Sequence, residues 1–325
     1  MTHPAGSETV ATIHATIDGR DVTAPAGTTI LEAARGIGIN VPTLCHHETL
    51  KPTGACRLCV VEVNNSGNLV TSCNTALAEG MVLSTESQIV VETRRLLLEL
   101  LLSDHPLVCM TCEQAGACEL QDLCYRYGIE DSSYSGERRQ FPIESDNPMI
   151  ERDMSKCILC GKCVRVCHEV QVTDAIDFCE RSFETQIAGP FDQPLDISFC
   201  RFCGQCVDIC PTGAIVNKDL KGVRSWQRTK VRTTCPFCGV GCGLDLNVHD
   251  GKVVGVTAAY DAPVNQGSLC VKGRFHTDFI TSPDRITTPL IKRDGVFEEA
   301  TWEDAMSLVA ERLLAIRAEG STEAI

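Results

Sequence analysis

Residues 157–167 read CILCGKCVRVC and residues 200–211 read CRFCGQCVDICP. Both stretches have the spacing C-x2-C-x2-C-x3-C, so they form an internal repeat, and Pro211 follows the second copy. Three cysteines in a tight loop can hold three irons of a cubane, while the fourth lies on the next turn and reaches a second cluster. The repeat therefore predicts a ferredoxin-like fold with two [4Fe–4S] clusters. Zinc is the alternative, but zinc modules use separate C-x2-C pairs.

The exchange of the fourth cysteine decides which residues share a cluster. Each predicted set combines three cysteines of one copy with the last cysteine of the other. One set is Cys157, Cys160, Cys163 and Cys210, and the other is Cys200, Cys203, Cys206 and Cys167.

The composition places these motifs in a reducing compartment. The chain has 21 cysteines, and its N-terminus shows neither the basic nor the apolar region of a secretory signal. Metal binding is therefore favoured over disulfides, and we expect a cytoplasmic protein. The longest apolar run, LLLELLLS at 96–103, is too short to span a bilayer and is interrupted by Glu99.

The charge balance argues against nucleic acid as a partner, because the net charge is −14 and nucleic-acid binding needs a basic surface. The stretch from Lys218 to Arg232 is locally basic, and we interpret it as a solvated linker.

The N-terminal region carries an earlier cysteine set, in which Cys45, Cys56, Cys59 and Cys73 are spaced C-x10-C-x2-C-x13-C. The alternation of ATIHATIDGRDVTAP around Asp18-Gly19 predicts a β-hairpin, and Thr29 to Glu32 has the pattern of a capping box that opens a short helix. This region resembles the β-grasp [2Fe–2S] ferredoxin domain at the N-terminus of complex I large iron–sulfur subunits. The resemblance implies that the four cysteines hold a [2Fe–2S] cluster.

A third kind of motif follows a predicted amphipathic helix that ends near Asp104. The spacing is H-x3-C-x2-C-x5-C and its residues are His105, Cys109, Cys112 and Cys118. By ligand type alone it could bind zinc. It resembles the His-ligated [4Fe–4S] cluster of complex I and iron-only hydrogenase subunits, which implies an iron–sulfur cluster here.

The last motif is CPFCGVGCGL at 235–244, followed by a cysteine in GSLCVKGRF. Its cysteines are Cys235, Cys238, Cys242 and Cys270, and DLNVHDGKVVGV predicts a hairpin around Asp250-Gly251. The motif resembles the N-terminal [4Fe–4S] domain of molybdenum or tungsten bis-pterin oxidoreductases. In that family the lysine that matches Lys272 lies between the cluster and the pterin, which implies a cofactor contact and an electron path. Residues 302–318 predict a further amphipathic helix.

Together, nineteen cysteines and His105 make twenty ligands, enough for five clusters. Cys124 and Cys179 remain, and we expect them to be small buried side chains. Lys156, Lys162, Arg165 and Arg201 flank ligand cysteines, where they could stabilise reduced clusters or simply be solvated.

The order of the motifs resembles the α subunit of soluble NAD-dependent formate dehydrogenases. This implies an α+β multidomain chain: a β-grasp [2Fe–2S] domain at 8–85, a helical segment with the His-ligated [4Fe–4S] cluster at 86–130, a two-[4Fe–4S] ferredoxin at 145–219 and the start of a bis-pterin domain at 230–325. It also implies formate or CO2 as substrate, a Mo- or W-bis-pterin guanine dinucleotide bound by later residues, and a β subunit with FMN and NAD, with a small [2Fe–2S] γ subunit beside it.

No catalytic residue can be assigned within the chain. The alternative is a diaphorase or complex I-like electron-transfer subunit without a substrate site. Iron-only hydrogenases would continue into an H-cluster domain, whose cysteine pattern is missing.

Overall fold

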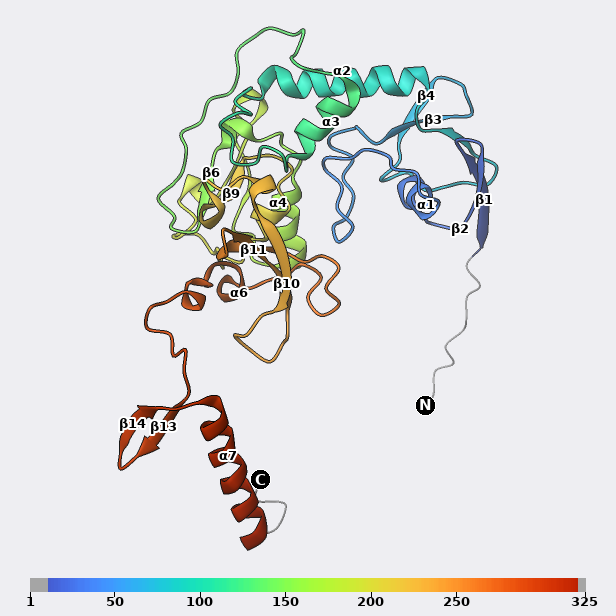
Figure 1. Ribbon diagram of the computed structural model, residues 1–325. Helices are drawn as coiled ribbons and strands as arrows, with labels where there is room; N and C mark the ends of the chain where they lie inside the picture. The colour runs from blue at the N-terminus through green and yellow to red at the C-terminus, as the bar shows by residue number, and fades with distance from the viewer. Residues whose placement is uncertain (1–10, 321–325) are drawn as a thin grey trace, which may run out of the picture. The chain divides into compact units, whose positions relative to one another are not determined.

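The computed structural model describes residues 11–320. They form two compact units that divide between Thr277 and Asp278 (Figure 1). The architecture is mixed α+β, as expected from the sequence. The domain boundaries given above remain predictions.

The first unit opens with a mixed five-stranded sheet of order β2-β1-β5-β3-β4. The strands are β1 (Thr12–Ile17), β2 (Arg20–Pro25), β3 (Val60–Val63), β4 (Asn68–Thr71) and β5 (Val82–Ser84). The predicted hairpin is confirmed, because β1 and β2 pair antiparallel around Asp18 and Gly19, both with positive φ. The predicted capping box is also confirmed: the Thr29 side chain accepts from the Glu32 amide at the start of α1 (Ile30–Gly36).

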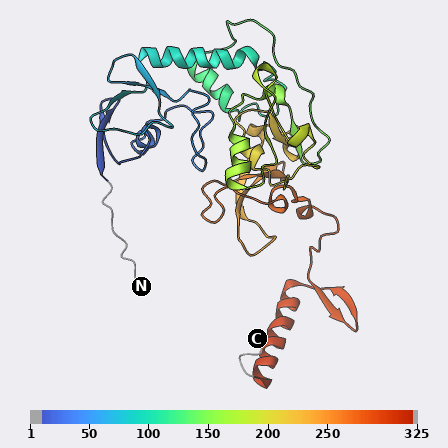
Figure 2. The same ribbon diagram turned by 180° about the vertical axis from the view of Figure 1, so that it is seen from behind.

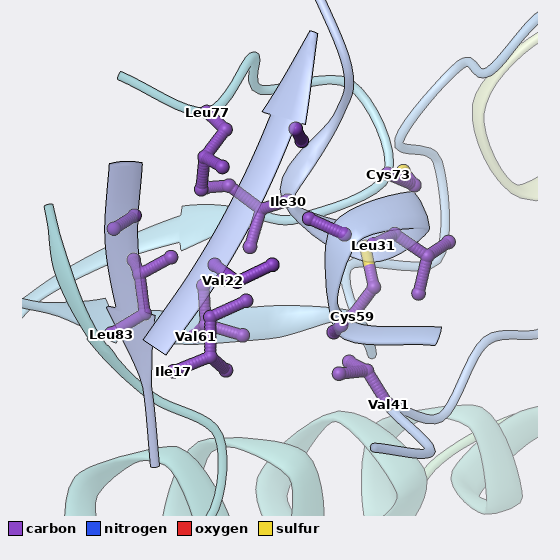
Figure 3. Close-up of a cluster of buried hydrophobic side chains, with 14 residues drawn as sticks. Ile17, Val22, Ile30, Leu31, Val41, Cys59, Val61, Cys73, Leu77 and Leu83 are labelled. Atoms are coloured by element: carbon purple, nitrogen blue, oxygen red, sulfur yellow. The ribbon is translucent and has the colours of Figure 1, made fainter. Parts of the chain in front are cut away.

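The sheet and α1 enclose an aliphatic core (Figure 3). Alternate residues of the hairpin point inward, and Ile17, Ile30 and Leu31 are fully buried. Cys59 and Cys73 border the same core. A core of this size gives the domain an apolar interior of its own, independent of any metal.

Two helices follow the sheet, α2 (Gln88–Asp104) and α3 (Glu119–Tyr127). α2 ends where predicted, and the amide of His105 caps it by donating to the Leu101 carbonyl at 3.1 Å. Val90, Leu98 and Leu102 form its buried face, which packs toward β3 and α3.

The repeated cysteine motifs build the next part of the unit. Its strands are β6 (Ile150–Arg152), which pairs with β9 (Ile215–Asn217), and β7 (Asp177–Cys179), which pairs with β8 (Gln186–Ala188). Its helices are α4 (Lys162–Arg165), continued by a π-helical turn at Val166–Val170, and α5 (Gln205–Asp208). The two copies share their backbone, because Leu159 and Phe202 both have φ of 51° and Gly161 and Gly204 both have φ of 69°.

The first unit ends with an antiparallel sheet of β10 (Thr229–Thr234), β11 (Gly243–His249) and β12 (Lys252–Ala258), followed by α6 (Val271–Phe275). The predicted hairpin around Asp250-Gly251 is confirmed. The interpretation of Lys218–Arg232 as a solvated linker is wrong. Its last residues form part of β10, and Lys218, Lys221 and Arg224 make specific hydrogen bonds to earlier segments.

Short 3-10 helices connect these elements. They span Met154–Lys156, Ser182–Glu184, Pro190–Asp192, Lys218–Leu220, Ser225–Gln227 and Asp278–Ile280.

The second unit is a hairpin of β13 (Leu290–Arg293) and β14 (Val296–Glu299), followed by α7 (Trp302–Glu319), drawn in red in Figures 1 and 2. The predicted helix is confirmed, and Thr301 caps it by accepting from the Asp304 amide. Its apolar residues remain exposed, with Trp302 at 71%. Among residues 11–320, no helix is long and apolar enough to cross a membrane.

Candidate metal centres

The cysteines remain available as ligands. All 21 are free thiols, and all lie within the described part of the chain. Within that part, no three Cys, His, Asp or Glu side chains gather tightly enough to surround a single metal ion. A tetrahedral zinc site holds its thiolates about 2.3 Å from one ion. A cluster of several irons keeps its ligands further apart.

Two cavities in the ferredoxin-like part each bring together cysteines from both copies of the motif. One cavity is lined by three cysteines of the first copy and the last of the second: Cys157, Cys160, Cys163 and Cys210. The other is lined by Cys200, Cys203 and Cys206 together with Cys167 of the first copy. The remaining lining of both is largely apolar, with Met154, Ile187 and Ile215 in the first.

The electrostatics of these thiols mainly follow the same grouping. Burial raises the pKa of Cys163 well above its usual range, nearby Cys160, Cys157 and Cys210 raise it further, and Cys206 of the other cavity adds the smallest of these contributions. Burial likewise raises the pKa of Cys206, with further contributions from Cys203, Cys200 and Cys167. Four thiolates could not stay ionised together in such a site without a cationic group, because burial and mutual repulsion both oppose it. The donor set therefore fits iron–sulfur clusters.

The N-terminal set forms two contacting pairs. The Cys56 amide donates to Cys45 Sγ at 3.4 Å. The Cys56 thiol lowers the pKa of Cys45 by hydrogen bonding, while the pKa of Cys56 is raised. Cys59 and Cys73 form the second pair, in which the Cys73 thiol lowers the pKa of Cys59. Four thiols arranged as two adjacent pairs fit a cluster in which each of two irons has two protein ligands.

In the helical segment, the structure brings the three cysteines into electrostatic contact. Burial raises the pKa of Cys118 to about 12, and Cys112 and Cys109 contribute. Burial lowers the pKa of His105 to about 4, so its imidazole is neutral, as a ligand requires. Its Nδ1 is buried and has no hydrogen-bond partner. An orphaned buried ring nitrogen fits a role as a metal ligand.

The last set lies in the two loops that directly precede β11 and α6. The Cys235 amide donates to the Cys242 carbonyl at 2.8 Å, which closes the loop between them. Burial raises the pKa of Cys242, and Cys235, Cys238 and Cys270 all contribute, so the four thiols face one another. Cys238 and Cys270 are exposed, and Lys272 on α6 lies close by in the chain. This set opens to the surface more than the ferredoxin-like sets do.

The two cysteines outside the sets differ. Cys124 is buried, as expected, beside Cys118 and Leu120. The expectation of a buried Cys179 is wrong, because it is only partly buried on β7.

The cations beside the cysteine sets differ in their burial. Lys162 is 2% exposed and pairs with Glu119, whereas Arg201 is exposed.

Sequence reasoning missed the contacts of four arginines, because their partners lie far away in the chain. Each donates from its guanidinium to the backbone carbonyl of a predicted ligand cysteine. The pairs are Arg165 with Cys45, Arg224 with Cys112, Arg139 with Cys157 and Arg274 with Cys203. Of these, only Arg165 stands out in the sequence as a neighbour of ligand cysteines, and those are Cys163 and Cys167 rather than Cys45.

Comparisons with known families match successive parts of the chain. Residues 10–88 match a 2Fe-2S iron-sulfur cluster binding domain, and residues 94–133 match the NADH-ubiquinone oxidoreductase-G iron-sulfur binding region. Residues 147–216 match the ferredoxin-like domain of NADH-quinone oxidoreductase subunit 3. Residues 228–282 match the molybdopterin oxidoreductase Fe4S4 domain, and residues 285–325 match molybdopterin oxidoreductase.

Individual relatives match most of the chain. The NADPH-Fe(3+) oxidoreductase subunit alpha of Geobacter sulfurreducens is 39% identical over 95% of the chain and 36% of the relative. The NADH-quinone oxidoreductase subunit 3 of Thermus thermophilus is 33% identical over 93% of the chain and 43% of the relative. A chain of an NAD+-reducing [NiFe]-hydrogenase crystal structure has a TM-score of 0.59 and 31% identity, over 64% of this chain and 88% of that one.

The fold and the cysteine sites define an iron–sulfur oxidoreductase subunit with 2Fe-2S and 4Fe-4S domains. The chain belongs to the family of iron–sulfur electron-transfer subunits of NADH-quinone and other NAD-linked oxidoreductases, joined to the start of a molybdopterin oxidoreductase domain. It spans less than half the length of the two curated relatives described above.

Proposed function

We propose that this chain carries electrons through five iron–sulfur clusters, between a substrate site in a longer protein and a flavin-bearing partner that reduces NAD. The observation that carries the proposal is the pair of cavities lined by cysteines of both ferredoxin motifs. Two [4Fe–4S] clusters with an exchanged fourth cysteine need eight thiols in two sets, whereas a zinc ion needs only one set of four ligands.

The proposed ligands are one [2Fe–2S] set and four [4Fe–4S] sets. The [2Fe–2S] set is Cys45, Cys56, Cys59 and Cys73, and the His-ligated set is His105, Cys109, Cys112 and Cys118. The ferredoxin sets are those that line the two cavities, and the last set is Cys235, Cys238, Cys242 and Cys270.

The clusters would supply one-electron redox chemistry, and the chain's own residues would determine how readily each accepts an electron. Cys163 is buried and Cys206 partly buried, which limits the access of water to the ferredoxin sets. Neutral His105 contributes one negative charge less than a thiolate would, which favours the reduced state of that centre. The exposed Cys238 and Cys270 leave the last set open at the surface of the first unit.

For the complete protein we propose formate as the substrate, oxidised to CO2 at a Mo- or W-bis-pterin centre beyond these residues. Lys272 would lie between the last cluster and the pterin. The match to molybdopterin oxidoreductases supports this, as does a Bacillus subtilis protein described as a candidate formate dehydrogenase, which is 33% identical over 95% of the chain. A β subunit with FMN and NAD, and a γ subunit with a further [2Fe–2S] cluster, would complete the complex in the cytoplasm.

The test is an anaerobic preparation of the complete complex, analysed for iron, sulfide, molybdenum, tungsten and pterin, and assayed for formate:NAD activity. We expect about 18 iron atoms from the clusters of this chain, in addition to the iron of the partner subunits. A preparation that contains zinc in place of iron and sulfide would contradict the electron-transfer proposal. Iron and sulfide without pterin or formate activity would contradict only the proposal on formate.

A second candidate is an electron-transfer subunit without a substrate site of its own. The 39% identity to an NADPH-Fe(3+) oxidoreductase subunit and the likeness to an NAD+-reducing hydrogenase chain favour it. The same preparation separates the two candidates, because this one predicts NAD(P)H-dependent reduction of the clusters without any reduction by formate.

A further inference from the structure

Three arginines connect neighbouring cysteine sets. Each arginine is next to one set, either in the chain or through an ion pair. Its guanidinium donates to the backbone carbonyl of a cysteine in another set. Arg165 lies between Cys163 and Cys167 and donates to the Cys45 carbonyl. Arg139 pairs with Asp104, the neighbour of His105, and donates to the Cys157 carbonyl at 3.0 Å.

Arg274 is the most buried of the three, with 1% exposure. It follows Cys270 by one helical turn in α6, and its Nε donates to the Cys203 carbonyl at 3.2 Å. Its ion-pair partner is Asp208 on α5, whose carboxylate also accepts from the Ala258 amide of β12 at 2.9 Å. Asp208 therefore attaches both α6, through the ion pair, and β12, through the amide hydrogen bond, to the second ferredoxin motif.

The space around Arg274 is closely fitted. A Cβ atom placed on Gly204 would lie 2.9 Å from Arg274 Cγ and 3.0 Å from its Nε. Because Gly204 also has a φ of 69°, only glycine fits there without strain. The absence of a side chain at Gly204 thus leaves room for Arg274 beside the Cys203 carbonyl.

We propose that Arg139, Arg165 and Arg274 are positioning residues that fix the spacing between consecutive clusters and hold positive charge beside them. The proposal rests on the cluster assignments of the proposed function. A guanidinium suits the task because its five donors, in a rigid fork, can bind the carbonyls of two loops at once and its charge does not titrate away. Positive charge near a cluster favours the reduced form, which carries one more electron.

Substitutions of Arg274 and of Asp208 should shift the reduction potential of the same cluster in opposite directions. In the full chain, Arg274→Met removes the positive charge and leaves Asp208, so the potential of the cluster at Cys200–Cys206 should fall. Asp208→Asn leaves Arg274 uncompensated, so the same potential should rise. At a fixed potential we expect about a tenfold change in the ratio of reduced to oxidised cluster in each case, which is about 59 mV for a one-electron couple.

The measurement is a potentiometric titration of the full chain followed by EPR, with iron content determined for each variant. Arg165→Met should move the [2Fe–2S] signal, whereas Arg274→Met should leave that signal unchanged and move the signal of the Cys200–Cys206 cluster. Arg274→Lys keeps the charge and should restore most of the potential even if loop geometry changes. Arg232→Met is the matched control, because Arg232 pairs with Asp245 and Asp261 but contacts no cysteine carbonyl among the described residues.

The outcomes separate the two proposals. A wild-type chain without iron–sulfur EPR signals would contradict the proposed function. A wild-type chain with these signals, in which Arg274→Met and Asp208→Asn shift the potential in the same direction or not at all, would overturn the role of the arginines alone. If Arg274→Met loses its iron, Arg274→Lys and Asp208→Asn still decide the sign.

Discussion

At the scale of single residues, the most sensitive position near a ligand is Gly213. A Cβ atom there would lie 2.6 Å from Cys112 Sγ, closer than real side chains approach one another. Gly213 has ordinary backbone angles, so substitution tests this contact rather than backbone strain. The residue follows Thr212 in a loop between α5 and β9, about 100 residues away from Cys112 in the chain.

We expect Gly213→Ala to displace the Cys112 thiol and to lower the iron content by about four atoms per chain, the content of one [4Fe–4S] cluster. The measurement is iron analysis with EPR of the anaerobically prepared chain. Gly136→Ala is the control, because nothing lies within 4 Å of its added Cβ. Full iron content in Gly213→Ala would show that Cys112 is not a ligand.

At the scale of elements, the attachment of α2 to the N-terminal sheet depends on one buried side chain. Arg94 has no exposed surface, and its guanidinium donates to the Leu58 carbonyl at 3.0 Å and to the Val60 carbonyl at 2.7 Å. It also contacts the Tyr127 hydroxyl of α3 and Glu86, both at 3.0 Å. The guanidinium of Arg94 on α2 therefore links this helix both to the N-terminal sheet and to α3.

We expect Arg94→Met to lower the opening free energy of α2 by about 3 kcal/mol, because it leaves buried acceptors without this donor. Hydrogen exchange of α2 amides in low urea measures this value. Arg126→Met is the matched control, since Arg126 pairs with the same Glu86 at 2.8 Å but is 38% exposed. Its cost should stay below about 1 kcal/mol. Equal effects of both changes would refute the role of burial.

At the scale of the whole molecule, the two halves of the first unit differ in how they are held together. The N-terminal core is aliphatic, and of its buried residues only Cys59 and Cys73 are proposed ligands. The ferredoxin-like core includes buried Cys163 and five partly buried ligand cysteines: Cys157, Cys167, Cys200, Cys206 and Cys210. The second core therefore depends on what its thiols bind.

We expect removal of iron by a chelator under reducing conditions to affect the two halves unequally. Amides of β6 and β9 should lose at least about tenfold of their protection from hydrogen exchange, while those of β1 and β2 keep theirs. Mass spectrometry after exchange, before and after chelation, gives both values in one sample. Equal loss in both halves would mean that the clusters stabilise the unit as a whole.

The sequence alone determined the features that depend on spacing along the chain. The turn at Asp18-Gly19 requires residues that accept positive φ, the cap at Thr29 needs Glu32 three residues later, and α2 ends where its apolar period ends. The grouping of cysteines around the two cavities also followed from spacing, because the three-cysteine loop leaves its fourth thiol pointing at the other copy.

Only the tertiary structure showed what joins these modules. Arg274 and Cys203 are 71 residues apart, Arg224 and Cys112 are 112 apart, and Arg165 and Cys45 are 120 apart. An arginine in a basic stretch carries no local sign of such a partner, so the sequence favoured solvation for Lys218–Arg232 and left it open for Lys162. The physical reason is that local spacing determines turns, caps and ligand sets, whereas burial of a charge is decided by the folded chain around it.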